Sequence, residues 1–236
     1  MSRRKSRPSL DNRRRLRDTL LFDLDGTLTD TDALHIQAYR LLLRPFGKTV
    51  TEEIYKSRIM GAANDAIMTW LFPDEPVARH RDLADEKERL FRSLADRMQP
   101  LDGLLELLAW AAANEIKTAV VTNAPRANAE MMLVALGLAD RFPVLVLGDE
   151  LARGKPDPLP YLTALDRLGA SADAALAFED SRSGVRAAHA AGIETVGMLT
   201  GLDAETLRAS GAAATIRDFA DPWLLGKLAR EFGSSR

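Results

Sequence analysis

The stretch FDLDGTLTD, residues 22–30, places two carboxylates and a glycine directly after the apolar run of residues 19–22. An apolar run that ends abruptly in charged residues and a glycine predicts a buried strand followed by a turn. Side chains two positions apart on a strand point the same way, so Asp23 and Asp25 are expected to face one crevice. The stretch therefore predicts a polar site at the carboxyl end of a first strand.

Further apolar runs recur along the chain. They cover residues 118–121, 144–147, 175–178 and 195–198, with a weaker run at 214–216. Because they are apolar throughout rather than alternating, they are typical of parallel strands that are covered on both faces. Patterns with helical spacing lie between them, at residues 104–114, 126–136, 158–168 and 183–191. This alternation predicts an α/β fold with a doubly wound parallel sheet.

Residues 31–96 interrupt the alternation. They have helical character over nearly their whole length, with separate patterns at residues 34–42, 54–60, 64–71 and 77–98, and Pro73 and Pro76 punctuate them. We expect a helical cap domain of four helices, inserted after the first strand and placed over the strand ends that carry the site. The predicted division is a catalytic core of residues 18–30 and 97–236 and a cap of residues 31–96.

The composition excludes several classes of protein. Apolar residues make up 46% of the chain and charged residues 28%, which is ordinary for a globular protein. No run approaches the roughly 20 apolar residues of a membrane helix, so no membrane partner is expected. The absence of cysteine excludes disulfides, thiolate metal sites and cysteine nucleophiles. A chain without disulfides is compatible with a reducing compartment, and we expect a cytoplasmic location.

The formal charge of −2 conceals an asymmetry. Residues 1–17 carry a net charge of +7, which leaves about −9 for the rest of the chain. A basic arm can bind nucleic acid or anionic lipid. However, no apolar face or aromatic residue accompanies these charges, and the remainder of the chain is acidic. We therefore expect residues 1–17 to be a disordered tail, and we do not expect a nucleic-acid partner.

The carboxylates of Asp23 and Asp25 suggest a metal site. Two carboxylates held together repel each other unless a cation or a shared proton relieves them. Magnesium prefers oxygen ligands and commonly takes one or two carboxylates together with a substrate phosphate. Gly26 allows a sharp turn and brings its amide close to an anion. On its own, however, an Asp-x-Asp-Gly run is more often an acidic turn with a helix cap.

Polar residues at three later strand ends or turns favour the metal-site interpretation. They are Thr122 with Asn123, Lys155 within Gly154-Lys155-Pro156, and Glu179-Asp180-Ser181. Each of them alone could be a helix cap or an exposed turn. Together with Asp23-x-Asp25, and in this order, they resemble the four motifs of the haloacid dehalogenase superfamily. The matched motifs extend over nearly the whole predicted folded region.

The resemblance implies a mechanism and a role for each residue. Asp23 would attack phosphorus and form an aspartyl-phosphate, and Asp25 would be the general acid and then the general base. Lys155 would share in catalysis by neutralising the phosphoryl oxygens. Two further sets of residues follow from the motifs. The phosphate would be bound by Gly26, Thr122, Asn123 and Lys155, and Mg²⁺ by Asp23, the backbone carbonyl of Asp25, Asp180 and Glu179.

Two features place the chain within that superfamily. Dehalogenases and phosphonatases lack the second aspartate of the first motif, so Asp25 argues against both. The helical insert and residues 30–35 resemble the branch that contains phosphoglycolate phosphatase and β-phosphoglucomutase. That mutase has a lysine and an arginine in its cap where this chain has Met60 and Asn64. The resemblance therefore implies a phosphatase of a small phosphorylated metabolite, with a phosphosugar mutase as the second candidate.

A third candidate is a non-catalytic binding or nucleic-acid-associated protein. The presence together of Asp23, Asp25, Lys155 and Asp180 argues against a decayed site. Substrate contacts from the cap and the adjoining loops are expected from polar side chains near the motifs, namely His35, Arg58, Asn64 and Arg126. We expect the protein to be a monomer or a homodimer.

Overall fold

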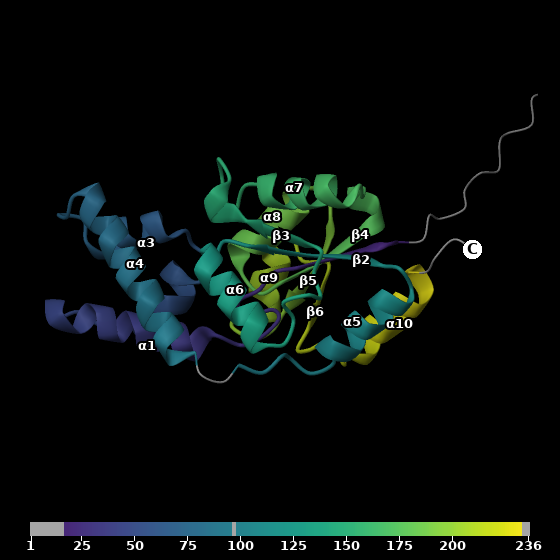
Figure 1. Cartoon of the computed structure of the whole chain (residues 1–236), viewed down its shortest axis with the longest axis horizontal. Helices are drawn as coiled ribbons and strands as arrows, with labels where there is room; N and C mark the ends of the chain where they lie inside the picture. Colours follow the sequence, from purple (N-terminus) through teal and green to yellow (C-terminus); the bar gives the residue numbers. More distant parts are fainter. Residues whose placement is uncertain (1–16, 96–97, 233–236) are drawn as a thin grey trace, which may run out of the picture.

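The computed structural model describes residues 17–95 and 98–232. Within them, six parallel strands form one sheet with the order β3-β2-β1-β4-β5-β6 (Figure 1). The strands are β1 (Thr19–Phe22), β2 (Lys117–Thr122), β3 (Val144–Leu147), β4 (Ala175–Glu179), β5 (Glu194–Met198) and β6 (Ala214–Ile216). The chain runs outward from β1 in both directions, so the order reverses beside β1. The predicted doubly wound α/β fold is confirmed, including the weaker sixth strand.

Helices cover both faces of this sheet. One face packs against α5 (Leu104–Ala113), α6 (Arg126–Ala135) and α10 (Pro222–Glu231), and the other against α7 (Leu159–Leu168) and α8 (Arg182–Ala190). A further helix, α9 (Ala204–Ala209), lies against β5 and β6. The strands are buried because both of their faces are covered, which explains their continuous apolar runs.

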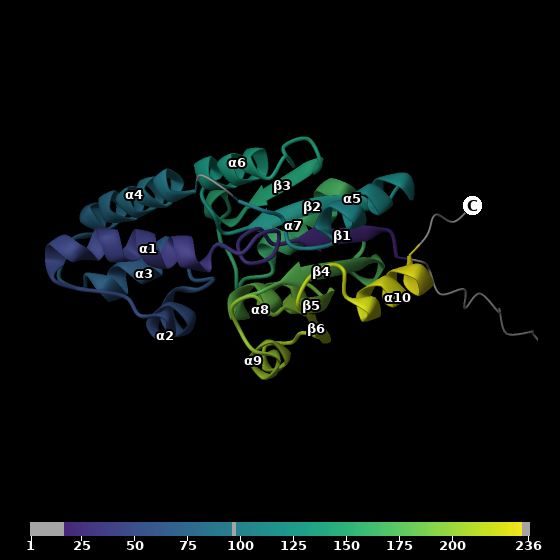
Figure 2. The same ribbon diagram turned by 90° about the horizontal axis from the view of Figure 1, so that it is seen from below.

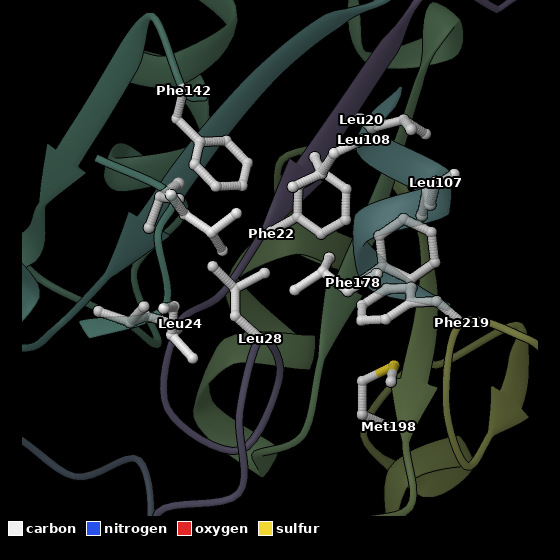
Figure 3. Close-up of a cluster of buried hydrophobic side chains, with 14 of the residues drawn as sticks. Leu20, Phe22, Leu24, Leu28, Leu107, Leu108, Phe142, Phe178, Met198 and Phe219 are labelled. Carbon is white, nitrogen blue, oxygen red and sulfur yellow. The ribbon is translucent and has the colours of Figure 1, made fainter. Parts of the chain in front are cut away.

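Aromatic rings fill the centre of the sheet face that packs against α5, α6 and α10 (Figure 3). Phe22 of β1 stacks on Phe178 of β4, with 5.1 Å between ring centroids, and Phe142 and Phe219 pack edge-on around this pair. Leu24 is fully buried in the same cluster. This packing holds the end of β1 in place, and it thereby fixes the backbone of Asp23, the residue that follows Phe22.

The helices between residues 32 and 94 form a separate layer at one end of the molecule (Figures 1 and 2). They are α1 (Asp32–Leu43), the short turn η1 (Arg44–Phe46), α2 (Glu52–Ile54), the π-helical turn η2 (Tyr55–Ile59), α3 (Asn64–Leu71) and α4 (Val77–Leu94). Tyr39, Met68 and Leu83 belong to an apolar cluster that is distinct from the two clusters of the sheet. This packing supports the proposed cap of residues 31–96.

The structure corrects several predicted boundaries in the cap. The helix expected over residues 77–98 ends at Leu94, and Met98 packs instead into the core of the sheet. The helix expected over residues 54–60 is divided into α2 and η2. Thr51 begins α2 by accepting a hydrogen bond from the amide of Ile54, and the π-helical turn then follows. Hydrophobic spacing does not distinguish these two helical types, because both keep one face apolar.

Arg17 does not belong to a free tail. Its guanidinium donates to the carbonyl of Ala175 over 2.7 Å and pairs with Glu194 and Glu231. The core therefore includes a residue that we had assigned to the basic tail, while residues 1–16 lie outside the described part. None of the helices in residues 17–95 and 98–232 combines the length and the apolar character needed to cross a membrane.

Candidate active site

Three adjacent strands bring the predicted motifs together. Asp23 follows β1, Thr122 ends β2, and Asp180 follows β4, and β1 lies between the other two strands in the sheet. Ligands of open α/β sheets bind at carboxyl ends beside the point where the strand order reverses. Here all three residues line a cavity of about 110 Å³ between the core and the cap. Thr122 is buried, and its hydroxyl accepts a hydrogen bond from the amide of Ala124.

Carboxylates are concentrated at the bottom of this cavity. Asp23, Glu179 and Asp180 are all buried, and each offers an oxygen within 4.8 Å of the others. Lys155 places its ammonium 2.5 Å from both Asp23 Oδ1 and Glu179 Oε1. Burial raises the pKa of Asp23 to about 8 although Lys155 opposes the shift, and burial likewise raises the pKa of Asp180. The single ammonium of Lys155 is thus insufficient to neutralise three carboxylates, and the cluster is suited to binding a further cation.

Lys155 is positioned by its neighbours in the fold. Burial disfavours its charge, but the carboxylates of Asp23 and Glu179 raise its pKa above the ordinary value. The Asn123 side chain accepts from the backbone N–H of Lys155 over 3.0 Å and donates to its carbonyl over 3.1 Å. A Cβ at Gly154 would come within 2.8 Å of Asn123 Oδ1, so glycine leaves room for this contact. Asn123, predicted to bind phosphate, therefore uses its amide group to hold Lys155.

Two glycines leave space for the acidic motif. A Cβ on Gly26, whose φ is +73°, would collide with the carboxylate of Asp180. A Cβ on Gly184 would likewise collide with Glu179. Glu179 Oε1 accepts from Lys155 and from Tyr161, whereas its buried Oε2 has no hydrogen-bond partner among the described residues. Glu179 thus acts chiefly on Lys155 and lies behind Asp23 and Asp180, which line the cavity.

The side chain of Asp25 lies outside the carboxylate cluster. Its Oδ1 accepts hydrogen bonds from Thr31 Oγ1 over 2.9 Å and from His35 Nε2 over 3.0 Å. Burial alone would raise the pKa of Asp25, but these hydrogen bonds and the charge of Lys87 hold it below the ordinary value. The side chain is therefore directed away from the carboxylate cluster, and its backbone carbonyl stays the predicted metal contact.

Comparison with known proteins agrees with this geometry. The family model described as haloacid dehalogenase-like hydrolase matches residues 20–198. The chain belongs to the haloacid dehalogenase-like hydrolases. The resemblance drawn from the four motifs is thereby confirmed, and so is the prediction of an enzyme of the hydrolase class.

Two named phosphatases and one solved structure are similar to this chain over most of its length. The hydrolase is 35% identical over 207 residues to a phosphorylated carbohydrates phosphatase of Thermotoga maritima, covering 85% of this chain and 94% of that protein. It is 37% identical over 221 residues to a phosphoglycolate phosphatase of Rhodospirillum rubrum, covering 87% and 90%. Among solved structures, CbbY of Rhodobacter sphaeroides in complex with xylulose-(1,5)bisphosphate matches with a TM-score of 0.75 and 26% identity, over 87% of this chain and 96% of that one.

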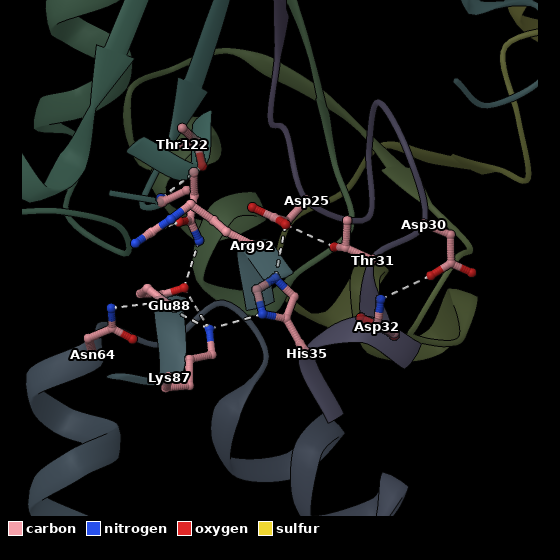
Figure 4. A network of polar contacts seen from close by, with 12 residues as sticks. Asp25, Asp30, Thr31, Asp32, His35, Asn64, Lys87, Glu88, Arg92 and Thr122 are labelled. Carbon is pink, nitrogen blue, oxygen red and sulfur yellow. Dashed lines mark hydrogen bonds and ion pairs between the residues drawn. The ribbon is translucent and has the colours of Figure 1, made fainter. Parts of the chain in front are cut away.

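A polar network from the cap reaches the Asp25 of this hydrolase (Figure 4). Lys87 Nζ lies 3.0 Å from His35 Nδ1 and donates to it, so the ring proton is on Nε2 and points to Asp25. Phe91 stacks on the imidazole with 4.1 Å between ring centroids. Burial and the charge of Lys87 lower the pKa of His35, although Asp25 opposes the shift, and this favours the neutral ring. His35 was predicted as a substrate contact, and the structure makes it a hydrogen-bond donor to Asp25.

Sequence reasoning missed the residues that complete this network. Glu88 accepts from Lys87 over 3.0 Å, from Asn64 over 2.9 Å and from Asn128 of α6 over 2.6 Å. Lys87 and Glu88 are buried although α4 is rich in charge. The signal was their spacing, because positions 87 and 88 fall on the same helical face as Leu83 and Phe91.

The structure does not bring all four predicted substrate contacts to the cavity. His35 and Asn64 line it, as does Met60, but neither Arg58 nor Arg126 does. Arg58 lies 6.0 Å from the centre of the Trp70 ring. Arg126 is exposed and pairs with Glu130 and Glu150. These two arginines therefore do not contact a substrate in the cavity as it stands.

Proposed function

We propose that this hydrolase is a Mg²⁺-dependent phosphatase that transfers the phosphoryl group of a small phosphorylated metabolite to Asp23 and then to water. One observation carries the proposal. The carboxylate of Asp23 lies beside the ammonium of Lys155 and the buried carboxylate of Asp180, while the side chain of Asp25 accepts hydrogen bonds from Thr31 and His35. This arrangement separates the residue that attacks phosphorus from the residue that moves protons.

The donor set fits Mg²⁺. Asp23, Glu179 and Asp180 with Lys155 have a formal charge of −2 when all are ionised, which a divalent cation neutralises. Oxygen donors suit magnesium, and Glu179 Oε2 is a buried acceptor without a protein partner among the described residues. Asp23 and Asp180 would hold the ion, together with the backbone carbonyl of Asp25, and Glu179 would support it from behind. When bound, Mg²⁺ would neutralise charge on the phosphoryl oxygens.

The side chains support a two-step reaction. In the first step an oxygen of Asp23 bonds to phosphorus, the ester bond breaks, and protonated Asp25 gives its proton to the leaving alkoxide. In the second step Asp25, now a carboxylate, takes a proton from a water whose oxygen attacks the same phosphorus. The bond from phosphorus to Asp23 breaks, which releases phosphate and restores both aspartates. Lys155 faces the developing negative charge throughout.

The cavity favours hydrolysis over mutase chemistry. A phosphosugar mutase must hold a second phosphate while the first is transferred. The positions where the resemblance implies a lysine and an arginine in the mutase carry Met60 and Asn64, and both line the cavity. The names of the two sequence relatives, both phosphatases, point the same way.

Turnover of an aryl phosphate tests the proposal. The protein should release phosphate with Mg²⁺, lose activity with a chelator and regain it when Mg²⁺ is restored. Asp23→Asn should abolish turnover, whereas Asp82→Asn, a matched change of an exposed carboxylate on α4, should not. Turnover that is unaffected by metal removal would contradict the mechanism. Conversion of β-glucose 1-phosphate to its 6-phosphate isomer, with little free phosphate, would favour the mutase.

A further inference from the structure

The positively charged side chains that line the cavity already have hydrogen-bond partners within the protein. Among the described residues that line it, Lys155 and Lys87 are the ones with a fixed positive charge. Lys155 contacts Asp23 and Glu179 and, in the proposed reaction, would face the reacting phosphate. Lys87 can donate three hydrogen bonds, and it gives them to the two oxygens of Glu88 and to His35 Nδ1. Neither ammonium therefore has a donor for a second anionic group at the cap end of the cavity.

The arginines near the cavity are engaged elsewhere. Arg126 pairs with Glu130 and Glu150 on the exposed surface. Arg182 of α8 donates to the backbone carbonyl of Lys56. Arg92 of α4 donates to Asn128 Oδ1 over 2.7 Å and does not line the cavity. The bidentate recognition that an arginine gives to a carboxylate or a phosphate is thus absent from the part of the cavity that the structure describes.

Apart from Lys87, whose donors are all used, acceptors and neutral groups make up the cap end of the cavity. The carboxylates of Asp32 and Glu88 line the cavity, together with the amide of Asn64 and the phenol rings of Tyr39 and Tyr55. Burial and the neighbouring Asp30 raise the pKa of Asp32 to about 6, against a hydrogen bond from Tyr55 and the charge of Lys56, so this carboxylate is ionised at pH 8. Hydroxyl groups of a ligand can donate to such carboxylates, whereas an anion would be repelled by them.

We propose that the site takes phosphate monoesters of neutral, hydroxyl-bearing molecules, and that it discriminates against esters with a carboxylate or a second phosphate at the far end. This inference rests on the proposed phosphatase function and selects among the substrate classes that the relatives' names offer. Asp32 is the specificity-determining residue, because its hydrogen-bond partner is the neutral phenol of Tyr55, whereas Glu88 accepts two hydrogen bonds from the ammonium of Lys87.

The start of α3 is the alternative anion site. Its N-cap is Ala63, which supplies no side-chain acceptor to the free amides of the first turn. Such amides can bind an anion. However, Glu88 Oε1 lies 2.9 Å from Asn64 Nδ2, and Asp65 occupies the same turn. An anion placed there would meet two carboxylates, so we assign this turn to neutral groups as well.

Matched pairs of substrates test the inference at pH 8. 2-Hydroxyethyl phosphate differs from 2-phosphoglycolate only by an alcohol in place of a carboxylate, and glycerol 3-phosphate is paired in the same way with 3-phosphoglycerate. Fructose 1-phosphate and fructose 1,6-bisphosphate test the second phosphate. Each compound is measured both as a substrate and as a competitor of an aryl phosphate, so that slow turnover does not hide binding. We expect the neutral member to lead by about tenfold or more in each pair.

Two variants test whether Asp32 causes the preference for neutral esters. Asp32→Asn should reduce the preference for the neutral esters by about threefold or more. Asp82→Asn, the same change at an exposed position of α4 outside the cavity, should leave the preference unaltered. Equal or faster turnover of 2-phosphoglycolate, or equally tight binding, by the wild-type protein would overturn the inference and point to the α3 turn. Aryl phosphate turnover that persists without Mg²⁺ or in Asp23→Asn would refute the proposed function instead.

Discussion

The buried pair of Lys87 and Glu88 offers a sharp test of how the cap is built. Their side chains are 4% and 7% exposed, and Lys87 Nζ lies 3.0 Å from both carboxylate oxygens. Lys87→Met keeps most of the apolar stem and removes the charge. It leaves Glu88 ionised within the cap with no cation in contact, and it removes the proton donor of His35 Nδ1.

The expected loss of stability follows from this geometry. Removing one member of a buried pair costs about 3–5 kcal/mol, because the remaining charge is uncompensated. Glu88 still accepts from Asn64 and Asn128 in the variant, so we expect the lower end, about 3 kcal/mol. The double variant Lys87→Met/Glu88→Gln has no stranded charge and keeps an amide oxygen for one asparagine. It should therefore be more stable than the single variant by about 1–2 kcal/mol.

The pH dependence gives an independent check. In the wild-type protein the charge of Lys87 holds the pKa of Glu88 below its ordinary 4.5 against the effect of burial. The contribution of Glu88 to stability is thus present above that value and is lost as the pH falls through the lower folded pKa. Without Lys87, burial raises the folded pKa above 4.5. The deficit of Lys87→Met should consequently be largest at pH 8 and shrink toward pH 5.

Urea unfolding followed by circular dichroism, at several pH values, measures these differences. Arg89→Met is the matched control, because Arg89 is exposed on the same helix, and it should stay within about 0.5 kcal/mol of the wild-type protein. The reasoning is refuted if Lys87→Met costs less than about 1 kcal/mol, or if the double variant is no more stable than the single one. A deficit that is constant between pH 8 and pH 5 would also contradict it.

Two further predictions concern residues whose predicted roles changed. Asn123→Ala removes both hydrogen bonds to the backbone of Lys155, and we expect kcat/KM for an aryl phosphate to fall by about tenfold or more. An unchanged kcat/KM would show that Lys155 is held by its ion pairs alone. Arg126→Ala breaks only exposed pairs with Glu130 and Glu150, so kcat/KM should change by less than about twofold. A larger loss, measured under the same conditions, would mean that this side chain reaches the substrate during turnover.

The succession of strands and motifs along the chain could be predicted from the sequence, because both are recognised from local patterns. Each strand that is buried on two faces needs a continuous apolar run, and β1, β2 and β4 each have one. The chemistry-bearing residues follow these runs directly, as Asp23 follows Phe22. Parallel strands bring their carboxyl ends to one edge, so the meeting of Asp23, Thr122 and Asp180 followed from the topology.

The roles of individual side chains within the site were decided by tertiary contacts. His35 and Lys87 are 52 positions apart, and Asn123 and Lys155 are 32 apart, so no local pattern joins them. Residue types also leave several uses open, and an asparagine beside a motif suits a phosphate contact as well as a backbone clamp.

The sequence by itself thus determined the fold class, the family and the position of Asp23 at the end of the first strand. Only the packed cap decided that Asp25 receives its proton donor from His35, that Lys87 and Glu88 neutralise each other, and that Arg58 and Arg126 lie outside the cavity. The physical reason is that hydrogen bonds and ion pairs act over a few ångströms. Which groups come that close is fixed by how the cap helices pack on the sheet.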